Sequence, residues 1–167
     1  MMIKSVLRFI VKIPDGFPLE AAGPVFCAGI TMFSPLTKYD AHLGGKRVGV
    51  VGIGGLGQMG VSLAKAMGNT VTAISTSPSK EAAAKEIGAD NFVVSTSPES
   101  MAAAADSLDL ILNTVSAQHD VNTYLPLLVG KSELLKKVQT NVMFRLPTVS
   151  LCKSVLTLCL TPSIRSC

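Results

Sequence analysis

The chain has 167 residues, 48% of them hydrophobic and 16% charged, a balance that permits a real core and excludes intrinsic disorder. The net charge of +4 comes from the end of the chain: residues 1–128 carry −1, from 9 Lys/Arg and 10 Asp/Glu, whereas residues 129–167 carry +5, from 6 Lys/Arg and 1 Asp/Glu. No basic stripe with interleaved aromatic residues appears, so the sequence gives no support for a nucleic-acid partner.

The four cysteines are Cys27, Cys152, Cys159 and Cys167. Their wide spacing, without a Cys-x-x-Cys pair, argues against a self-contained zinc cluster, and a core of this size needs no disulfide scaffold. We therefore expect a protein of the reducing cytoplasm. No signal peptide is evident, and glycines interrupt the uncharged run 48–64, so we expect no membrane span.

The first 46 residues are predicted to form a short strand over 10–14, a turn at Asp15-Gly16, and two helices over 18–27 and 29–38. Cys27 falls between these two helices. A lone cysteine in such an apolar setting is most often a packing residue of the core.

A glycine-rich stretch, Gly52-Ile53-Gly54-Gly55-Leu56-Gly57, lies between an apolar strand over 47–51 and a helix over 58–67. This strand–turn–helix context is the one that a dinucleotide-binding fingerprint requires, although a structural turn also uses glycine. The first glycine allows the tight turn, the second lets the backbone approach a pyrophosphate, and the last lets helix and strand pack closely. The helix N-terminus then attracts phosphates. The candidate cofactor-binding residues here are Gly52, Gly54, Gly55, Leu56 and Gly57.

The second predicted strand, 69–74, ends where this fold places an acidic residue to bind the ribose 2′-hydroxyl of NAD. The sequence from 75 to 80 has no carboxylate, but it has hydroxyls and a lysine, which suit a 2′-phosphate and favour NADP over NAD. The Ser77-Pro78 pair is also a good helix start, and both roles are compatible. The candidate 2′-phosphate residues are Ser75, Thr76, Ser77 and Lys80.

The pattern then continues with a helix over 78–87, a strand over 91–94, a helix from 97 to 105 and a strand over 108–115. Ligands bind at the carboxyl ends of strands in such sheets, so Asn113, Thr114 and Val115 are predicted to meet the cofactor. His119 is interpreted as a surface residue in the loop before a helix over 120–128.

These elements predict an α/β fold, a Rossmann-type parallel sheet with helices on both faces and strand order 3-2-1-4. The sheet is expected to be incomplete, with about four strands, because no fifth or sixth strand is evident after Leu128. We expect residues 1–46 to be a linker of one strand and helices, residues 47–128 the NADP-binding Rossmann portion, and residues 129–167 an irregular, divergent basic tail.

Several motifs occur in one order: Val11–Gly16 (VKIPDG), Cys27–Thr31 (CAGIT), the glycine turn within Val48–Gly60, and Ile111–Val115 (ILNTV). On these motifs, the region from about Arg8 to Leu128 resembles the zinc-dependent medium-chain alcohol dehydrogenases, and within them the cinnamyl alcohol dehydrogenase-like, NADP-dependent branch. No similarity is evident from Val129 onward.

The resemblance implies a zinc-containing enzyme that transfers a hydride between a primary alcohol and NADP, with a small-molecule alcohol or aldehyde as substrate. It implies that Cys27 occupies the position of a catalytic zinc ligand and that the catalytic residue Thr31 lies near the nicotinamide. It also implies that the 75–80 loop binds the 2′-phosphate. A zinc-free quinone or enoyl reductase is disfavoured, since that branch needs no ligand cysteine.

The family's catalytic domain, with its other zinc ligands, is expected to precede this region, and one cysteine cannot hold a zinc ion. We therefore expect a fragment or abnormal product that retains the cofactor half of the apparatus, is inactive alone, and is marginally stable because its sheet edge is exposed. The alternative is a non-catalytic NADP-binding or interaction module that forms a dimer with a homologue.

Overall fold

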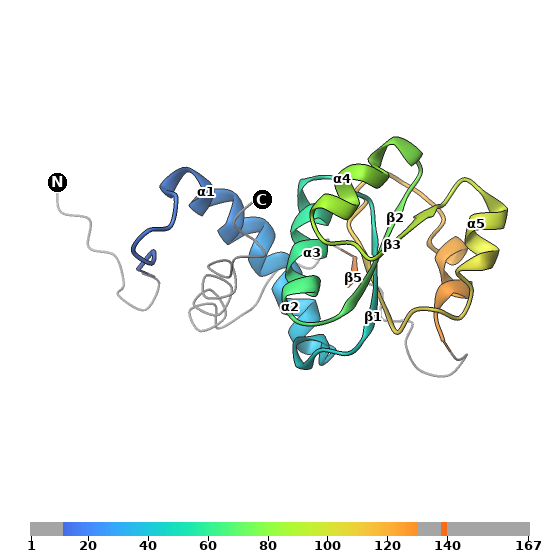
Figure 1. The fold of residues 1–167 in the computed structure, drawn as a ribbon, viewed down its shortest axis with the longest axis horizontal. Helices are drawn as coiled ribbons and strands as arrows, with labels where there is room; N and C mark the ends of the chain where they lie inside the picture. Colours follow the sequence, from blue (N-terminus) through green and yellow to red (C-terminus); the bar gives the residue numbers. More distant parts are fainter. Residues whose placement is uncertain (1–11, 130–137, 140–167) are drawn as a thin grey trace.

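The computed structural model describes residues 12–129 and 138–139, which are built around one parallel sheet (Figure 1). In this part of the chain the sheet has five strands in the order β3-β2-β1-β4-β5, and every neighbouring pair is parallel. The strands are β1 (Arg47–Val51), β2 (Thr70–Ser75), β3 (Asn91–Val94), β4 (Leu110–Asn113) and β5 (Val138–Gln139). The predicted α/β class and the order of the first four strands are confirmed.

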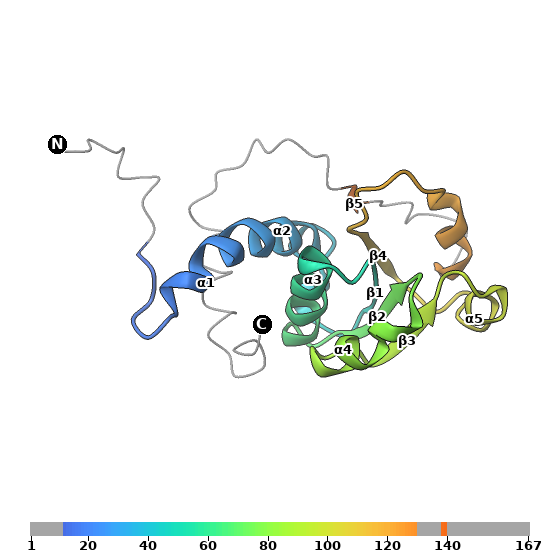
Figure 2. The ribbon, with the colours of Figure 1, turned by 90° about the horizontal axis from the view of Figure 1, so that it is seen from above.

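Helices cover both faces of this sheet, as predicted. Figure 2 shows α2, α3 and α4 on one face and α5 with η5, in orange, on the other. The helical elements are α1 (Leu19–Pro24), η2 (Val25–Gly29), α2 (Ile30–Lys38), η3 (Ala41–Leu43), α3 (Gly55–Ala66), η4 (Pro78–Lys80), α4 (Glu81–Glu86), α5 (Pro98–Ala103) and η5 (Val121–Leu127).

The central strand β1 divides its side chains between two hydrophobic clusters, because successive residues of a strand face opposite sides. Val48 and Val50 belong to the larger cluster, under α2 and α3, whereas Val51 belongs to the smaller one, under α5 and η5. Gly49 leaves room on that second side, since a Cβ there would lie 2.6 Å from Leu108 Cδ1. The strand therefore anchors both faces of the domain.

The two helices predicted over 18–27 and 29–38 form one continuous helical segment, Leu19–Lys38, which extends from the sheet in blue in Figure 2. By length and composition alone this segment would suit a membrane span, and 39% of its most apolar 18-residue stretch is buried within the described structure. Its second half packs against α3 through residues such as Met32 and Leu36, which are fully buried, as in the core helix of a globular domain. Glycine has a low helix propensity, but packing against α3 keeps the chain helical through Gly29. The predicted break at residue 28 was therefore wrong.

Two further predictions were wrong. Residues 12–14, the described part of the strand predicted over 10–14, form no strand; proline at position 14 has no N–H to donate to a sheet. The helix predicted over 120–128 is the 3₁₀ segment η5, because Pro126 removes a helical donor and favours tighter turns. The four predicted strands are present, and the two-residue strand β5 pairs with the free edge of β4 beyond them.

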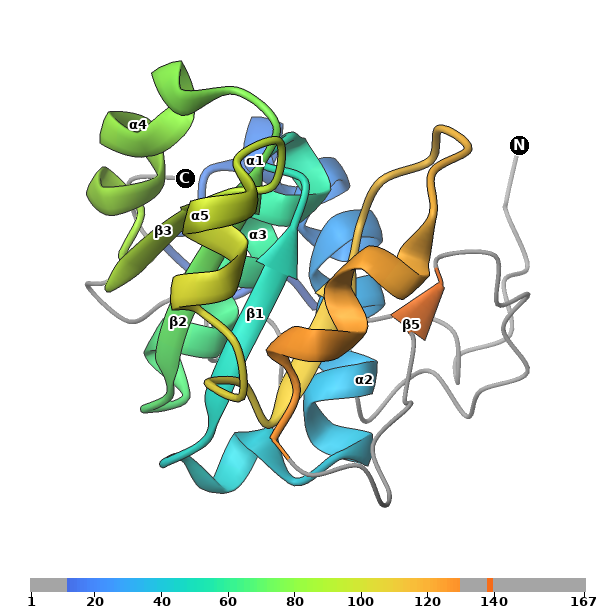
Figure 3. The same ribbon diagram turned by 90° about the vertical axis from the view of Figure 1, so that its right-hand side faces the viewer.

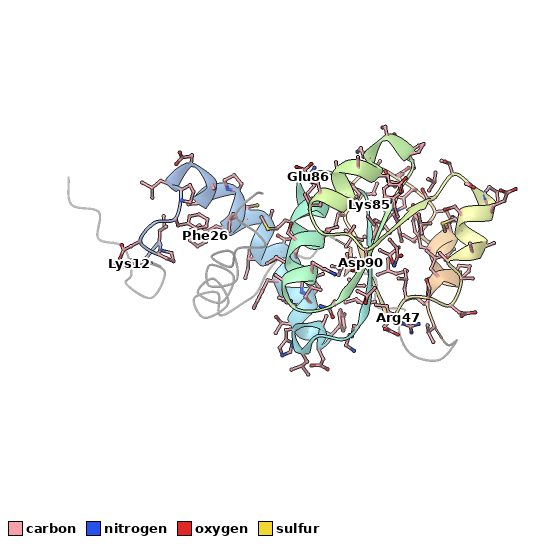
Figure 4. All side chains as sticks on the ribbon, in the orientation of Figure 1. Lys12, Phe26, Arg47, Lys85, Glu86 and Asp90 are labelled. Carbon is pink, nitrogen blue, oxygen red and sulfur yellow. The ribbon has the colours of Figure 1, made fainter. Side chains whose placement is uncertain are left out.

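Two ion pairs lie at the end of the sheet opposite the glycine turn: Arg47–Asp109 links β1 to β4, and Lys65–Asp90 links α3 to the start of β3. Asp109, just before β4, accepts three hydrogen bonds from Arg47 at the start of β1: Nη2 at 2.6 Å, Nε at 3.1 Å and the backbone N–H at 2.9 Å. These bonds lower the pKa of Asp109 against the opposing effect of burial. Asp90 accepts from Lys65 Nζ and from the N–H of Val71; burial raises the pKa of Asp90, but these bonds together outweigh it and lower the pKa. Figure 4 labels Arg47 and Asp90 in this region.

We predict that Asp109→Asn lowers the free energy of unfolding at neutral pH by about 1–2 kcal/mol, because the ion pair with Arg47 is lost. A carboxylate with a depressed folded-state pKa stabilises the fold above its unfolded pKa, and this contribution disappears as the pH falls through the folded pKa. The variant should therefore lose less stability than the wild type on acidification below about pH 5, as urea denaturation at several pH values will show.

The matched control is Asp15→Asn. Asp15 also forms an ion pair, with Lys12, but both of these side chains are at least 80% exposed. This variant should unfold as the wild type does. Equal losses of unfolding free energy in the two variants would contradict a stabilising role for the Arg47–Asp109 ion pair.

Candidate functional site

The loops that follow β1, β2 and β4 meet at one end of the sheet, the upper end in Figure 3. The first of them is the glycine turn between β1 and α3. Gly52 has φ +89° and donates its N–H to the carbonyl oxygen of Ile74 at 2.9 Å. A Cβ at Gly52 would also lie 2.7 Å from Val115 Cγ2, so both the backbone conformation and the space require glycine.

The last glycine of the turn sets the distance between α3 and β1. A Cβ on Gly57 would lie 1.8 Å from the carbonyl oxygen of Gly52, so no other residue fits without moving the helix. A Cβ on Gly54, by contrast, would meet no protein atom within 4 Å. The first turn of α3 has no side-chain cap and no acidic residue, so its free N–H groups are available to an anion beside Gly54.

The loop after β2 contacts the glycine turn directly. Lys80 Nζ donates to the carbonyl oxygen of Ile53 at 3.1 Å, a link between the two loops that sequence reasoning did not foresee. Ser75 is buried and its hydroxyl accepts from the N–H of Ser77 at 3.2 Å, whereas Thr76 is exposed. The hydroxyls of Ser77 and Ser79 are hydrogen-bonded at 2.8 Å. The predicted 2′-phosphate residues thus lie beside the predicted pyrophosphate residues.

The acidic residue that follows the 75–80 loop is already paired with a lysine. Glu81, the first residue of α4, is bonded by Lys85 Nζ at 2.6 Å along the helix. The six residues 75–80 themselves contain no carboxylate. The loop therefore offers hydroxyl donors and one ammonium group to a ligand.

The residues after β4 form a wall of the glycine turn. Thr114 Oγ1 lies 2.8 Å from the carbonyl oxygens of both Val51 and Gly52, so its hydroxyl is hydrogen-bonded within the turn. Val115 is half-buried against Gly52. Asn113 is buried, and its amide faces inward to the loop rather than toward solvent. The structure brings these three residues to the turn, and their contact with a cofactor stays a prediction.

His119 is not the surface residue that was expected. It is half-buried, its Nε2 lies 2.9 Å from Asn113 Nδ2, and its Nδ1 lies 2.7 Å from the carbonyl oxygen of Ala117. The ring also packs edge-on against Tyr124 at 5.9 Å between centroids. The sequence does not predict the contact between Asn113 and His119; it shows only that His119 lies in the loop after a buried strand.

The predicted zinc ligand lies on a different element. Cys27 is a free, exposed cysteine in η2, which packs against α3, and its carbonyl oxygen accepts from Thr31 Oγ1 at 2.8 Å. Exposure rules out the core-packing interpretation of this cysteine. Within the described residues no group of three or more His, Cys, Asp or Glu side chains could hold a metal ion, so the residues described do not fit a catalytic zinc.

Comparison with known proteins agrees with this geometry. Residues 55–131 match the model of a family described as zinc-binding dehydrogenase. The chain is 42% identical over 153 residues to cinnamyl alcohol dehydrogenase 5 of Arabidopsis thaliana and 46% identical over 153 residues to cinnamyl alcohol dehydrogenase 1 of Ocimum basilicum. Both matches cover 90% of this chain and 43% of the relative.

Solved structures give the same result. The cinnamyl alcohol dehydrogenase SbCAD4 of Sorghum bicolor matches with a TM-score of 0.75 and 37% identity, over 91% of this chain and 48% of that one. The cinnamyl alcohol dehydrogenase of Helicobacter pylori, complexed with NADP(H), matches with a TM-score of 0.64 and 34% identity, over 73% and 33%.

The chain spans less than half the length of the curated relatives it matches. A match over 90% of 167 residues must run past Leu128 wherever it begins, so the expectation that similarity ends there was wrong. The domain boundaries at residues 46 and 128 stay predictions. On the family match, the identities and the shared fold, the chain is similar to the zinc-binding dehydrogenases and, among its relatives, to the cinnamyl alcohol dehydrogenases.

Proposed function

We propose that this chain binds NADP(H) and forms the cofactor-binding part of a cytoplasmic oxidoreductase that interconverts a primary alcohol and an aldehyde. One observation carries the proposal: Lys80 reaches the glycine turn in a loop that has hydroxyls and no carboxylate. The loop after β2 and the turn after β1 thus form one anion-binding surface, as a dinucleotide with an additional phosphate requires.

The glycine turn is suited to the pyrophosphate of the dinucleotide. Gly54 faces open space, and the N–H groups of Gly55, Leu56 and Gly57 begin a 12-residue helix with no competing carboxylate in its first turn. A phosphate there would gain hydrogen bonds from backbone N–H groups and a favourable interaction with the helix dipole.

The loop after β2 is suited to the 2′-phosphate. Lys80 donates to a neutral carbonyl oxygen, that of Ile53, and this bond is weaker than one to a phosphate. Exchanging that carbonyl for a phosphate is therefore favourable, while the exposed Thr76 and the partly exposed Ser77 can donate further hydrogen bonds. The Helicobacter pylori relative, which is complexed with NADP(H), supports the same preference.

The cofactor supplies hydride transfer to or from the substrate carbon when it is bound. The residues of this chain would bind and orient it: the turn holds the pyrophosphate, and Asn113, Thr114 and Val115 wall the turn. Thr31 is proposed to lie near the nicotinamide and Cys27 to be one zinc ligand, as the family resemblance implies. Since the described residues do not fit a zinc site, no catalytic step is assigned to a metal.

A second candidate is a non-catalytic NADP-binding or interaction module that pairs with a homologous chain. It is favoured by the contrast between a complete glycine turn and a single candidate metal ligand among the described residues. Gel filtration with and without a full-length relative separates the two, since a stable monomer in both cases argues against pairing.

We predict that Lys80→Ala weakens NADPH binding by about tenfold to a hundredfold and leaves NADH binding unchanged, because the charged contact to the 2′-phosphate is lost. Fluorescence titration of the purified chain with each cofactor measures this. Lys12→Ala is the control, since Lys12 lies outside the three loops of the proposed site, in an exposed ion pair with Asp15 (Figure 4). Equal loss in both variants, or equal affinity of the wild type for NADPH and NADH, would refute the NADP assignment.

We predict that Gly54→Val keeps the fold but reduces the affinity for NADPH more than about tenfold, because its side chain fills the space proposed for the pyrophosphate. The backbone at Gly54, with φ −106° and ψ −169°, is open to any residue. Gly57→Ala should instead lower the free energy of unfolding by about 1–3 kcal/mol or more, through its clash with Gly52. Urea denaturation followed by titration distinguishes the two; tight binding by Gly54→Val would exclude this phosphate site.

We also predict that the purified chain, with NADP and added zinc, does not oxidise a primary alcohol at a measurable rate, because a zinc site needs about three protein ligands. The increase in NADPH absorbance follows the reaction. Turnover at the rate of an ordinary dehydrogenase would show that the chain is a complete enzyme.

A further inference from the structure

The loop after β4 is closed by a hydrogen-bonded pair that joins a buried amide to a histidine. Asn113, the last residue of β4, is only 6% exposed. Its Oδ1 accepts from the N–H of Val115 at 3.2 Å, which fixes the orientation of the amide. Asn113 Nδ2 therefore points to Nε2 of His119, 2.9 Å away.

These contacts also favour one tautomer of the imidazole. An amide NH₂ group can only donate, so Nε2 of His119 must present its lone pair. A carbonyl oxygen can only accept, so Nδ1 must carry the proton that it donates to Ala117 at 2.7 Å. A neutral imidazole with its proton on Nδ1 satisfies every contact, whereas a proton on Nε2 would face the NH₂ group of Asn113.

The two residues that follow Asn113 attach the same loop to the glycine turn. Thr114 Oγ1 lies 2.8 Å from the carbonyl oxygen of Gly52, and the side chain of Val115 blocks any Cβ at Gly52. Between these attachments, residues 116–118 are exposed, so closing the loop adds little to the core. What the loop fixes is the position of Val115 beside the turn, with Tyr124 packed behind the histidine.

We propose that His119 is a positioning residue for the dinucleotide, which acts through Asn113 to hold Val115 against the glycine turn. This inference rests on the proposed function, since it assumes that the turn binds NADP(H). His119 does not touch the turn in any contact described above; its effect on affinity is transmitted by the fixed amide and the backbone of Val115.

The first test measures the tautomer of His119 by ¹⁵N–¹H NMR of the imidazole in mildly alkaline buffer. The sequence contains two histidines, and a His42→Asn variant assigns the signals. The expected result is the Nδ1–H form for His119. The Nε2–H form would overturn the proposed hydrogen-bond arrangement, whatever the chain binds.

The second test titrates NADPH into His119→Ala, His119→Gln and the control His42→Ala, whose histidine lies exposed in η3. His119→Ala should bind about tenfold more weakly than the wild type. Glutamine can accept from Asn113 and donate to Ala117, so His119→Gln should recover affinity to within about threefold. Urea unfolding midpoints, measured alongside, show whether a loss of binding reflects a loss of folding.

The outcomes separate this inference from the proposed function. If the wild type binds NADPH and His119→Ala binds equally well, or if alanine and glutamine weaken binding equally, the positioning role is overturned and the function stands. If the wild type binds no dinucleotide, the proposed function fails and the role in binding fails with it, while the tautomer still decides the geometry of the pair.

Discussion

The close approach of α3 to the end of β1 is the constraint on which the rest of this structure depends. Gly57 lies so near the carbonyl oxygen of Gly52 that only a hydrogen atom fits between them. This contact places the N-terminus of α3 directly above the central strand. The loops after β2 and β4 are then arranged around it, the first through Lys80 and the second through Thr114. The arrangement of the three loops, which we propose as a cofactor site, therefore depends on one backbone contact.

Much of the fold was predictable because each local pattern agreed with the sheet as a whole. Buried runs such as Val48–Val51 and Val71–Ile74 predicted strands, and Gly52 and Gly57 lie where the fingerprint requires them. Their spacing reflects strict steric limits on the turn, so it could be read directly from the sequence. The helix predicted from Ser97 is a similar case: the Ser97 hydroxyl accepts from Ser100 N–H at 3.3 Å as a helix cap.

The errors arose where long-range packing overrides local preference. The segment Leu19–Lys38 contains Pro24, Gly29 and Pro35, each of which favours a break, yet contact with α3 keeps it helical. The pairing of Asn113 with His119 and the link from Lys80 to Ile53 join residues whose contact depends on how three loops meet in space. A single sequence carries no local record of such contacts, so they become visible only in the assembled fold.

The ion pair between Arg47 and Asp109 has a consequence for the order in which the domain forms. The two residues are separated by 62 positions, and they bring together β1 and β4, which are adjacent in the sheet but distant in the chain. By contrast, β1, α3 and β2 are consecutive and close only a short loop. Because closing a long loop costs more entropy, the β1–α3–β2 unit is expected to form first. Docking of β4 then adds the wall of the glycine turn, so the proposed site is expected to be complete only late in folding.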